Sequence, residues 1–350
     1  MKDKDITIII ITYNRYPFLL RLLKFYDNYN FNFLILDSSS HELNDSTLMN
    51  YLNKKYVKYK KYNSSILFAH KIADGCQVIT TPYAVLCADD DFLIPAGILE
   101  ARNFLKNNAD FTSAHGLYFN HTSSEVAQKH GFSIGPLYQN GHSSEQDSAE
   151  ERLNAYLSGE TGYYPMYAVH RTDLFQQIWS ETKTYVFDWG LSELFPCALS
   201  FIHGKMKVLP VFYESREPNT YTWYDENRHR EMYSEEKLDK AVAGIAKHLS
   251  LVEGIPDKDA TQIAESAFQG YLERVELKMA NRSNGSTSTW LRLRQKVRFR
   301  TRLRQMFCQG CYPSIYPEYF DDYLKVKEAV LSANLTQEEL NVARRDFAKQ

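Results

Sequence analysis

Three consecutive carboxylates, Asp89, Asp90 and Asp91, are the residues whose type and spacing most clearly suggest chemistry in this sequence. They lie between apolar runs at 83–88 and 92–94, which predicts a turn at the end of a buried strand. Each negative charge disfavours ionisation of the next, so a cation should stabilise the cluster, and a divalent metal with oxygen ligands suits it. A solvated acidic turn, or an N-cap for a helix near Pro95, is the other interpretation.

The elements that must position these acids alternate between strand and helix. Apolar runs at 6–11, 33–36 and 83–88 predict buried strands, and helical periodicity occurs at 17–26 and 68–79. This order is typical of a parallel α/β sheet with right-handed crossovers. Ligands of such sheets bind beyond the carboxyl ends of the strands. There the sequence places residues 12–15, Asp37 and the three acids.

The rest of the chain has a different pattern. Strands are expected within 111–138 and at 207–212, and a helix should end near Gly204. Long amphipathic helices are predicted at 235–252 and 259–280, followed by a polar, low-complexity linker at 281–289. Further helices are expected at 317–333 and after the capping box Thr336-Gln-Glu-Glu339.

Length and charge bound the class of protein without naming a partner. The chain has 350 residues, enough to bury a large core, and a formal net charge of −2. Its N-terminal apolar run is too short for a signal-peptide core, and no later run reaches the length of a membrane span. We therefore expect a cytoplasmic protein, soluble or peripheral at the inner face of the membrane.

The ordered set of strand-end motifs resembles the nucleotide-sugar-binding half of family 2 glycosyltransferases with the GT-A fold. The motifs are Thr12-Tyr13-Asn14-Arg15 after the first strand, Asp37 after the second, and Ala88-Asp89-Asp90-Asp91 after the third. The resemblance is good over residues 5–105, thinner to residue 218 and absent beyond.

What this resemblance implies first is an architecture. It predicts an α/β, GT-A (nucleotide-diphospho-sugar transferase-like) domain at 1–233, with a mostly parallel sheet flanked by helices. Its nucleotide-sugar-binding half would be 1–105 and its acceptor half 106–233. A helical region at 234–280 and a basic helical region at 290–350 would form a C-terminal extension.

The resemblance also implies roles at the base end of a nucleotide site. Thr12 and Tyr13 would hold the base, with Tyr13 stacking on it, and Asp37 would accept a hydrogen bond from its ring N–H. Arg15, which completes the first motif, belongs to the same set of nucleotide-sugar-binding residues. Lys71 is a further candidate for a base or phosphate contact, and a solvated helix lysine is the alternative.

At the phosphate end, the resemblance assigns the acidic triplet to ribose and metal. Asp89 and Asp90 would lie near the ribose and the metal. Asp91 matches the acid that most directly coordinates Mg²⁺ or Mn²⁺ bridging the diphosphate. Such a metal would neutralise the charge that develops on the departing nucleoside diphosphate.

The catalytic base would come from a later segment. In the family, a carboxylate at the start of a helix deprotonates the acceptor hydroxyl for in-line attack at the anomeric carbon, with inversion. Asp188 fits the helix start and Glu193 fits the spacing to Gly204, so both stay open. The alternatives are an N-cap for Asp188 and an exposed helix position for Glu193. His203 and Arg216 are candidates for diphosphate contacts from this side.

A basic segment lies near the C-terminus. Residues 290–307 include seven arginines and lysines and no acid. A basic helix with some aromatic residues suits an anionic membrane surface, where lipid-linked sugar acceptors reside. A solvated helix that pairs with the helices of 235–280 is the alternative. No nucleic-acid module surrounds the segment, so nucleic-acid binding is not expected.

The sequence thus predicts an inverting, metal-dependent glycosyltransferase of surface-polysaccharide or glycolipid synthesis. It would move a sugar from a nucleotide sugar, with a UDP-sugar favoured, to a hydroxyl of a glycan or lipid-linked acceptor. One alternative is a catalytically inactive nucleotide-sugar or glycan-binding module. Another is a metal-dependent nucleotidyltransferase, although no Gly-rich phosphate loop follows the first strand.

Overall fold

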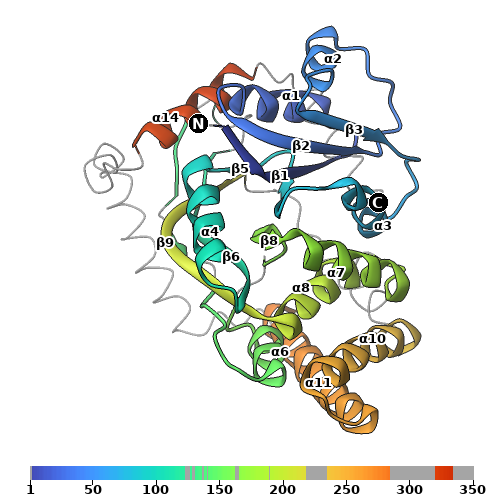
Figure 1. Ribbon diagram of the computed structural model, residues 1–350. Coiled ribbons are helices and arrows are strands. Elements are labelled where there is room, and N and C mark those ends of the chain that lie inside the picture. The colour runs from blue at the N-terminus through green and yellow to red at the C-terminus, as the bar shows by residue number, and fades with distance from the viewer. Residues whose placement is uncertain are drawn as a thin grey trace.

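The computed structural model describes residues 2–122, 127, 131–135, 138–139, 141–161, 165–188, 190–217, 235–283 and 320–333. Within these residues the chain forms a nine-stranded sheet flanked by helices (Figure 1). Its strands are β1 (Lys2–Thr12), β2 (Asn30–Asp37), β3 (Val57–Lys61), β4 (Tyr83–Ala88), β5 (Phe92–Leu93), β6 (Phe111–Asn120), β7 (Tyr138–Gln139), β8 (Val169–Arg171) and β9 (Lys205–Arg216).

The helices cover both faces of this sheet. They are α1 (Tyr16–Phe25), α2 (Ser46–Leu52), α3 (Phe68–Gly75), α4 (Pro95–Asn107), α6 (Ala149–Ser158), α7 (Thr172–Tyr185), α8 (Leu191–His203), α10 (Glu235–Glu253), α11 (Asp257–Ser283) and α14 (Phe320–Ser332). Short 3-10 turns occur at η1 (Cys76–Val78) and η2 (Pro165–Tyr167).

The first four strands are parallel, in the order β3-β2-β1-β4. Side chains of β1 alternate between two cores: Ile8 and Ile10 pack with α1, α4 and α14, whereas Ile9 packs with α3, α7 and α8. All three are fully buried. Burial on both faces explains why this strand is continuously apolar.

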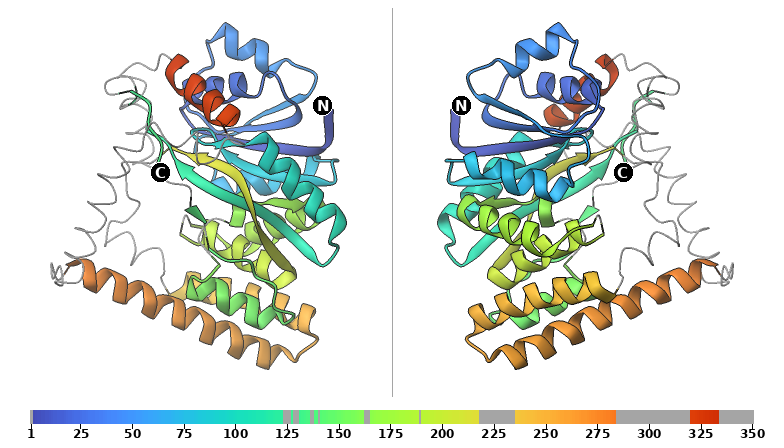
Figure 2. Two further views of the ribbon diagram at one scale, coloured as in Figure 1. Left: turned by 90° about the vertical axis from the view of Figure 1, so that its left-hand side faces the viewer. Right: turned by 90° about the vertical axis from the view of Figure 1, so that its right-hand side faces the viewer.

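Beyond β4 the sheet is mixed and curls back on itself (Figure 2). β8 is antiparallel to both β4 and β6, β9 is parallel to β6, and β5 is antiparallel to β9. Since only residues 89–91 separate β4 from β5, the pairing of β5 with β9 returns the far edge of the sheet to the acidic triplet. The predicted α/β sheet with flanking helices is confirmed, with the parallel part confined to β1–β4 and to the β6–β9 pair.

Close backbone packing holds α4 against the curled edge. A Cβ atom on Gly97 would lie 2.3 Å from the carbonyl oxygen of Phe212 and 2.8 Å from Cα of Tyr213. Backbone atoms cannot swing away as side-chain atoms can, so only glycine permits this approach. The helix that follows the triplet is thereby fixed to the strand that ends beside it.

The C-terminal helices pack at two opposite ends of the molecule. α10 and α11 pack with α6 and α8 at the end away from β2 and β3 (Figure 2), which confirms a C-terminal helical region. α14 returns to α1, where Val326 and Val330 are fully buried and Lys325 donates to the Tyr29 hydroxyl at 2.7 Å.

Several predictions fall partly or wholly outside the described residues. The expected linker at 281–289 begins inside α11, which continues to Ser283, and its remainder is outside. The basic segment at 290–307 and the helix after Thr336 are outside as well. Among the described helices, none combines the length and apolar character that a bilayer crossing requires.

Candidate active site

The carboxyl end of β4 carries the acidic triplet. The N–H of Asp91 donates to the carbonyl of Ala88 at 3.4 Å, which closes the turn before β5. Asp89, Asp90 and Asp91 are only 2%, 4% and 3% exposed. A solvated acidic turn is therefore the wrong interpretation. Buried carboxylates need partners, and the neighbouring elements supply them.

The turn after β1 supplies the first cation. Arg15 Nε lies 3.3 Å from Asp89 Oδ1, and Arg15 Nη2 lies 2.5 Å from Asp90 Oδ2. Thr12 Oγ1 donates to Asp89 Oδ2 at 2.7 Å. The Arg15 guanidinium stacks over the ring of Phe18 at 4.7 Å. The first and third predicted motifs are thus in direct contact.

The end of β9 supplies the second cation, from more than a hundred residues away. Arg216 Nε lies 3.3 Å from Asp91 Oδ2 and 3.4 Å from Glu214 Oε1. The N–H of Glu217 donates to Asp91 Oδ1 at 2.8 Å. The Arg216 guanidinium lies 5.4 Å from the ring centre of Tyr167. The second half of the chain therefore completes the surroundings of Asp91.

A third arginine, Arg21, links α1 to the turns that follow β4 and β9. Arg21 Nη1 donates to Glu217 Oε2 at 2.7 Å, and Arg21 Nη2 donates to the carbonyl of Asp90 at 2.7 Å. His121 Nε2 lies 3.5 Å from the same Glu217 oxygen. Burial raises the pKa of Glu217, but Arg21 and His121 outweigh it and lower that pKa to about 2. Glu217 is therefore a permanent anion that anchors the turn.

Carboxylates outnumber the arginines that contact them in the described part of this site. The acids are Asp89, Asp90, Asp91, Glu214 and Glu217, and the arginines are Arg15, Arg21 and Arg216.

Burial, with a smaller contribution from neighbouring carboxylates, raises the pKa values of three of these acids. Burial raises the pKa of Asp89 to about 6 and that of Asp91 to about 7, although Arg15 and Arg216 oppose the two shifts. Burial also raises the pKa of Glu214 well above its usual range, against Arg216 and with a further contribution from Asp91. The site around Asp91 therefore favours one more proton or one more cation.

The described residues do not fit a metal ion held by Asp89 and Asp91 as they are arranged. Both oxygens of Asp91 already accept contacts, from the Glu217 N–H and from Arg216, and Asp89 is paired with Arg15. No group of three or more His, Cys, Asp or Glu side chains in the described ranges could hold a metal ion. Carboxylate oxygens do suit Mg²⁺ and Mn²⁺. A metal at Asp91, which stays a prediction, would require Arg216 to move.

The two candidate bases differ in their surroundings. Asp188 is half-buried, and its Oδ1 accepts the N–H of Leu191, the first residue of α8, at 3.1 Å. Glu193, in the first turn of α8, is exposed to solvent. Nearby protein atoms still desolvate it enough to raise its pKa, while Arg216 acts in the opposite direction. Glu193 is thus linked electrostatically to the arginine that contacts Asp91.

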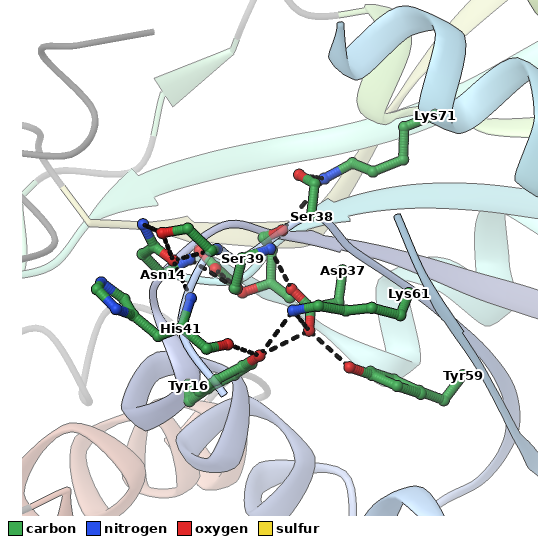
Figure 3. A network of polar contacts seen from close by, with 12 residues as sticks. Asn14, Tyr16, Asp37, Ser38, Ser39, His41, Tyr59, Lys61 and Lys71 are labelled. Atoms are coloured by element: carbon green, nitrogen blue, oxygen red, sulfur yellow. Dashed lines mark hydrogen bonds and ion pairs between the residues drawn. The ribbon is translucent and has the colours of Figure 1, made fainter. Parts of the chain in front are cut away.

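The base end of the predicted site is a row of residues across three strands. Thr12 on β1 is in register with Asp37 on β2, and Asp37 is in register with Lys61 on β3. Asp37 is fully buried and is surrounded by hydrogen-bond donors (Figure 3). Tyr13 lies half-buried in the turn after β1. Its stacking on a base stays a prediction.

Lys71 is not the solvated helix lysine that was the alternative. It is 3% exposed, and its Nζ donates to the carbonyl of Thr12 at 3.1 Å and to Ser38 Oγ at 2.8 Å (Figure 3). Burial lowers the pKa of Lys71 to about 8, although Asp37 and Asp89 oppose the shift. The lysine joins the end of β1 to the turn after β2.

His203 lies apart from the acids. Its Nε2 is 2.8 Å from Nδ1 of His248 on α10, at the end of α8 opposite Glu193. Ten residues of helix separate the two ends by about 15 Å. The ring therefore joins α8 to α10, and its suggested diphosphate contact finds no support in these contacts.

Sequence reasoning missed Arg21, Glu214 and Glu217 as members of the site. A signal was present, because the charged run 214–217 follows a predicted strand, the same feature that singled out the triplet. Nothing in the local sequence shows that β9 ends beside β4, because that follows from the pairing of β9 with β5.

Comparisons with known proteins yielded structural neighbours only. No family model matches the sequence, and no curated protein matches it. Crystal structures of S. aureus TarS residues 1–349, alone and in complex with UDP-GlcNAc, are similar with a TM-score of 0.49 and 14% identity. They cover 78% of this chain and 72% or 73% of TarS 1–349. The complex with UDP has a TM-score of 0.47 and 13% identity. Similarity at this level concerns only the course of the backbone.

Proposed function

We propose that this chain is an inverting glycosyltransferase that moves a sugar from a nucleotide sugar to a hydroxyl of a glycan or lipid-linked acceptor. The observation that supports this most is the contact network around Asp91, where the β4 triplet meets Arg216. Arg216 in turn acts on the pKa of Glu193. A site for an anionic leaving group and a group able to take a proton are thereby joined through one arginine.

The donor would lie across the carboxyl ends of β3, β2, β1 and β4. Adjacent strands are spaced by about 4.8 Å, so the row from Lys61 to the triplet extends about 14 Å. This is enough for a base, a ribose and a diphosphate laid end to end. The base would occupy the Thr12 and Asp37 end, and the diphosphate the end where Arg15 and Arg216 lie.

The reaction would be a single displacement. The acceptor oxygen forms a bond to the anomeric carbon while the bond from that carbon to the diphosphate oxygen breaks. The nucleoside diphosphate leaves with the electron pair, and the acceptor proton passes to a carboxylate. Attack from the face opposite the leaving group inverts the anomeric configuration. Arginines beside the departing oxygens stabilise the charge that develops there.

Glu193 is the carboxylate we assign as base. Its raised pKa suits a group that must accept a proton near neutral pH, and its exposure allows an acceptor hydroxyl to reach it. Asp188 has one oxygen committed to the backbone of α8. We therefore assign Asp188 the role of holding the helix start.

The second half of the chain would supply the acceptor site and a membrane contact. Residues 106–233 would form the acceptor half, and 290–307 would attach the protein to an anionic membrane surface that carries lipid-linked acceptors. Co-sedimentation with anionic liposomes tests the attachment. Binding that survives deletion of residues 290–307 would contradict it.

The activity itself is tested with a panel of nucleotide sugars that includes UDP-GlcNAc. A bound donor should raise the unfolding temperature by mass action, and the same donor should release its nucleoside diphosphate when an acceptor extract is added. Stabilisation without release, over a broad acceptor panel, would instead support the binding-module alternative. No stabilisation by any nucleotide sugar would overturn the proposal.

A further inference from the structure

The carboxylate of Asp37 is saturated with hydrogen-bond donors. Its Oδ2 accepts from Tyr16 Oη at 2.9 Å, from Tyr59 Oη at 2.6 Å and from Lys61 Nζ at 2.9 Å (Figure 3). Its Oδ1 accepts from the N–H of Ser39 at 2.7 Å. Each carboxylate oxygen offers about two acceptor positions, so the three donors on Oδ2 leave no position on that oxygen, and Oδ1 accepts from the backbone of Ser39.

Burial excludes a further partner for this carboxylate. Asp37 is 0% exposed, and the donors around it come from α1, β3 and the turn after β2. A ring N–H of a bound base would have to displace one of them. Each is a direct contact to a charged acceptor, and such hydrogen bonds are the stronger ones in proteins.

Lys61, unlike Asp37, is accessible and can form a further hydrogen bond. Its Nζ donates to Asp37 and lies 3.0 Å from Tyr16 Oη, which together use two of the three ammonium protons. The side chain is 41% exposed, so this row of side chains meets solvent at an ammonium group. Asp37 and Tyr16 hold that group in a fixed position.

We infer that Lys61, held by Asp37 and Tyr16, is the residue of this row that contacts the base of a bound nucleotide, and that Asp37 positions Lys61 without touching the base. This inference rests on the proposed function. An ammonium group can only donate, so it recognises a carbonyl oxygen. Uracil and cytosine both carry a carbonyl at the 2-position, and only uracil carries the ring N–H that a free carboxylate would select. The base site should therefore discriminate little between UDP and CDP.

The test is calorimetric titration of UDP and of CDP into the wild type, Lys61→Met, Lys60→Met and Asp37→Asn. The wild type should bind the two nucleotides with dissociation constants within about threefold of each other. Lys61→Met should weaken both by about tenfold or more, as expected for loss of a hydrogen bond from a charged donor.

Lys60→Met is the matched control. Lys60 is the neighbouring lysine on β3, its side chain is 42% exposed, and it pairs with Asp74 at 2.5 Å on the opposite face of the strand. Both affinities should be unchanged in this variant. Asp37→Asn should lower both affinities by the same factor, since it loosens Lys61 for either base.

Two results would overturn the inference alone. One is a wild-type preference for UDP of tenfold or more that disappears in Asp37→Asn. The other is Lys61→Met binding both nucleotides as the wild type does. If Asp37→Asn does not fold, the lysine pair still decides. Failure of the folded wild type to bind any nucleoside diphosphate would overturn the proposed function as well.

Discussion

Asp37 is the last residue of β2, and Asp91 lies three residues beyond the end of β4. Both carboxylates are buried, yet their surroundings shift their pKa values in opposite directions. Burial acts to raise the pKa of Asp37, but hydrogen bonds from Ser39, Tyr59 and Lys61 outweigh it and lower that pKa. Burial dominates at Asp91 and raises the pKa to about 7. At the base end, hydrogen-bond donors stabilise the ionised form of Asp37. At the phosphate end, the protonated form of Asp91 is favoured.

This difference suggests that Asp37 has a structural role, whereas Asp91 lies where a ligand or ion could bind. A saturated carboxylate anchors the elements that donate to it, here α1 and β3. A cluster in which carboxylates outnumber the arginines that contact them favours a further cation. We therefore expect substitution of Asp37 to act on a ligand only indirectly, through the side chains that it holds, and substitution of Asp91 to change the affinity for a cation or ligand directly.

The largest expected effect is on turnover at the Asp91 end. Glu193→Gln should lower kcat by about 10²- to 10⁴-fold, because the general base is lost, and should leave UDP affinity within about threefold of the wild type. Asp188→Asn is the matched control and should retain most of kcat. Measured nucleotide release that falls in Asp188→Asn and not in Glu193→Gln would exchange the two assignments.

The next effect is on folding through the buried pair of Arg21 and Glu217. Arg21→Met leaves the Glu217 anion buried without its main cation, so the free energy of unfolding should fall by about 3–5 kcal/mol. Lys54→Met removes the half-buried partner of the exposed Asp27 and should cost less than about 1 kcal/mol. Chemical denaturation measures both. Equal losses in the two variants would mean that Glu217 does not anchor the turn.

The pH dependence of stability should separate Asp37 from Asp91. The raised pKa of Asp91 means that the folded state holds a proton that the unfolded state has lost between pH 4 and 7. Its contribution to stability is therefore present below about pH 4 and is lost as the pH rises to 7. The free energy of unfolding of Asp91→Asn, relative to the wild type, should rise by at least about 1 kcal/mol over this interval.

Asp37 should behave in the opposite way. Its lowered pKa gives stability that is present above about pH 4 and is lost as the pH falls through the folded-state value. Relative to the wild type, Asp37→Asn should therefore become more destabilised as the pH rises towards 4 and should stay so above it. Parallel profiles for the two variants in urea denaturation would remove the distinction between the two ends.

The smallest effect concerns metal affinity. Since Arg216 occupies Asp91, a bound Mn²⁺ would have to displace it, and Arg216→Met should bind Mn²⁺ about tenfold more tightly than the wild type. Arg102→Met, which removes an arginine paired with Asp5 elsewhere, serves as control. Calorimetric titration of Mn²⁺ measures this. Identical affinities in all three proteins would show that Arg216 does not compete with the metal.

The parallel half of the molecule could be predicted from sequence because each of its strands is marked by a pattern of neighbouring residues. Continuous apolar runs gave β1, β2 and β4, and polar residues after each run placed Thr12, Asp37 and the triplet on one edge. α7 was not predicted, although Phe175, Ile178, Trp179 and Thr182 have helical spacing and are buried. α2 was also not predicted.

The rest of the site depends on contacts that no local pattern contains. Asp37 looked like a free acceptor in sequence because Tyr16, Tyr59 and Lys61 arrive from two other elements. Arg21 meets Glu217 across 196 residues, through the curl of the sheet. Such partners are set by tertiary packing, so the sequence identified the acids and not what surrounds them.

The most direct test of this account is a crystal structure of the chain with UDP. We predict the diphosphate beside Arg15 and Arg216, the base over the turn that carries Tyr13, and a base carbonyl within hydrogen-bond distance of Lys61 Nζ. UDP bound away from the carboxyl ends of β1–β4, or bound there with Arg216 and Lys61 both turned away, would contradict the account.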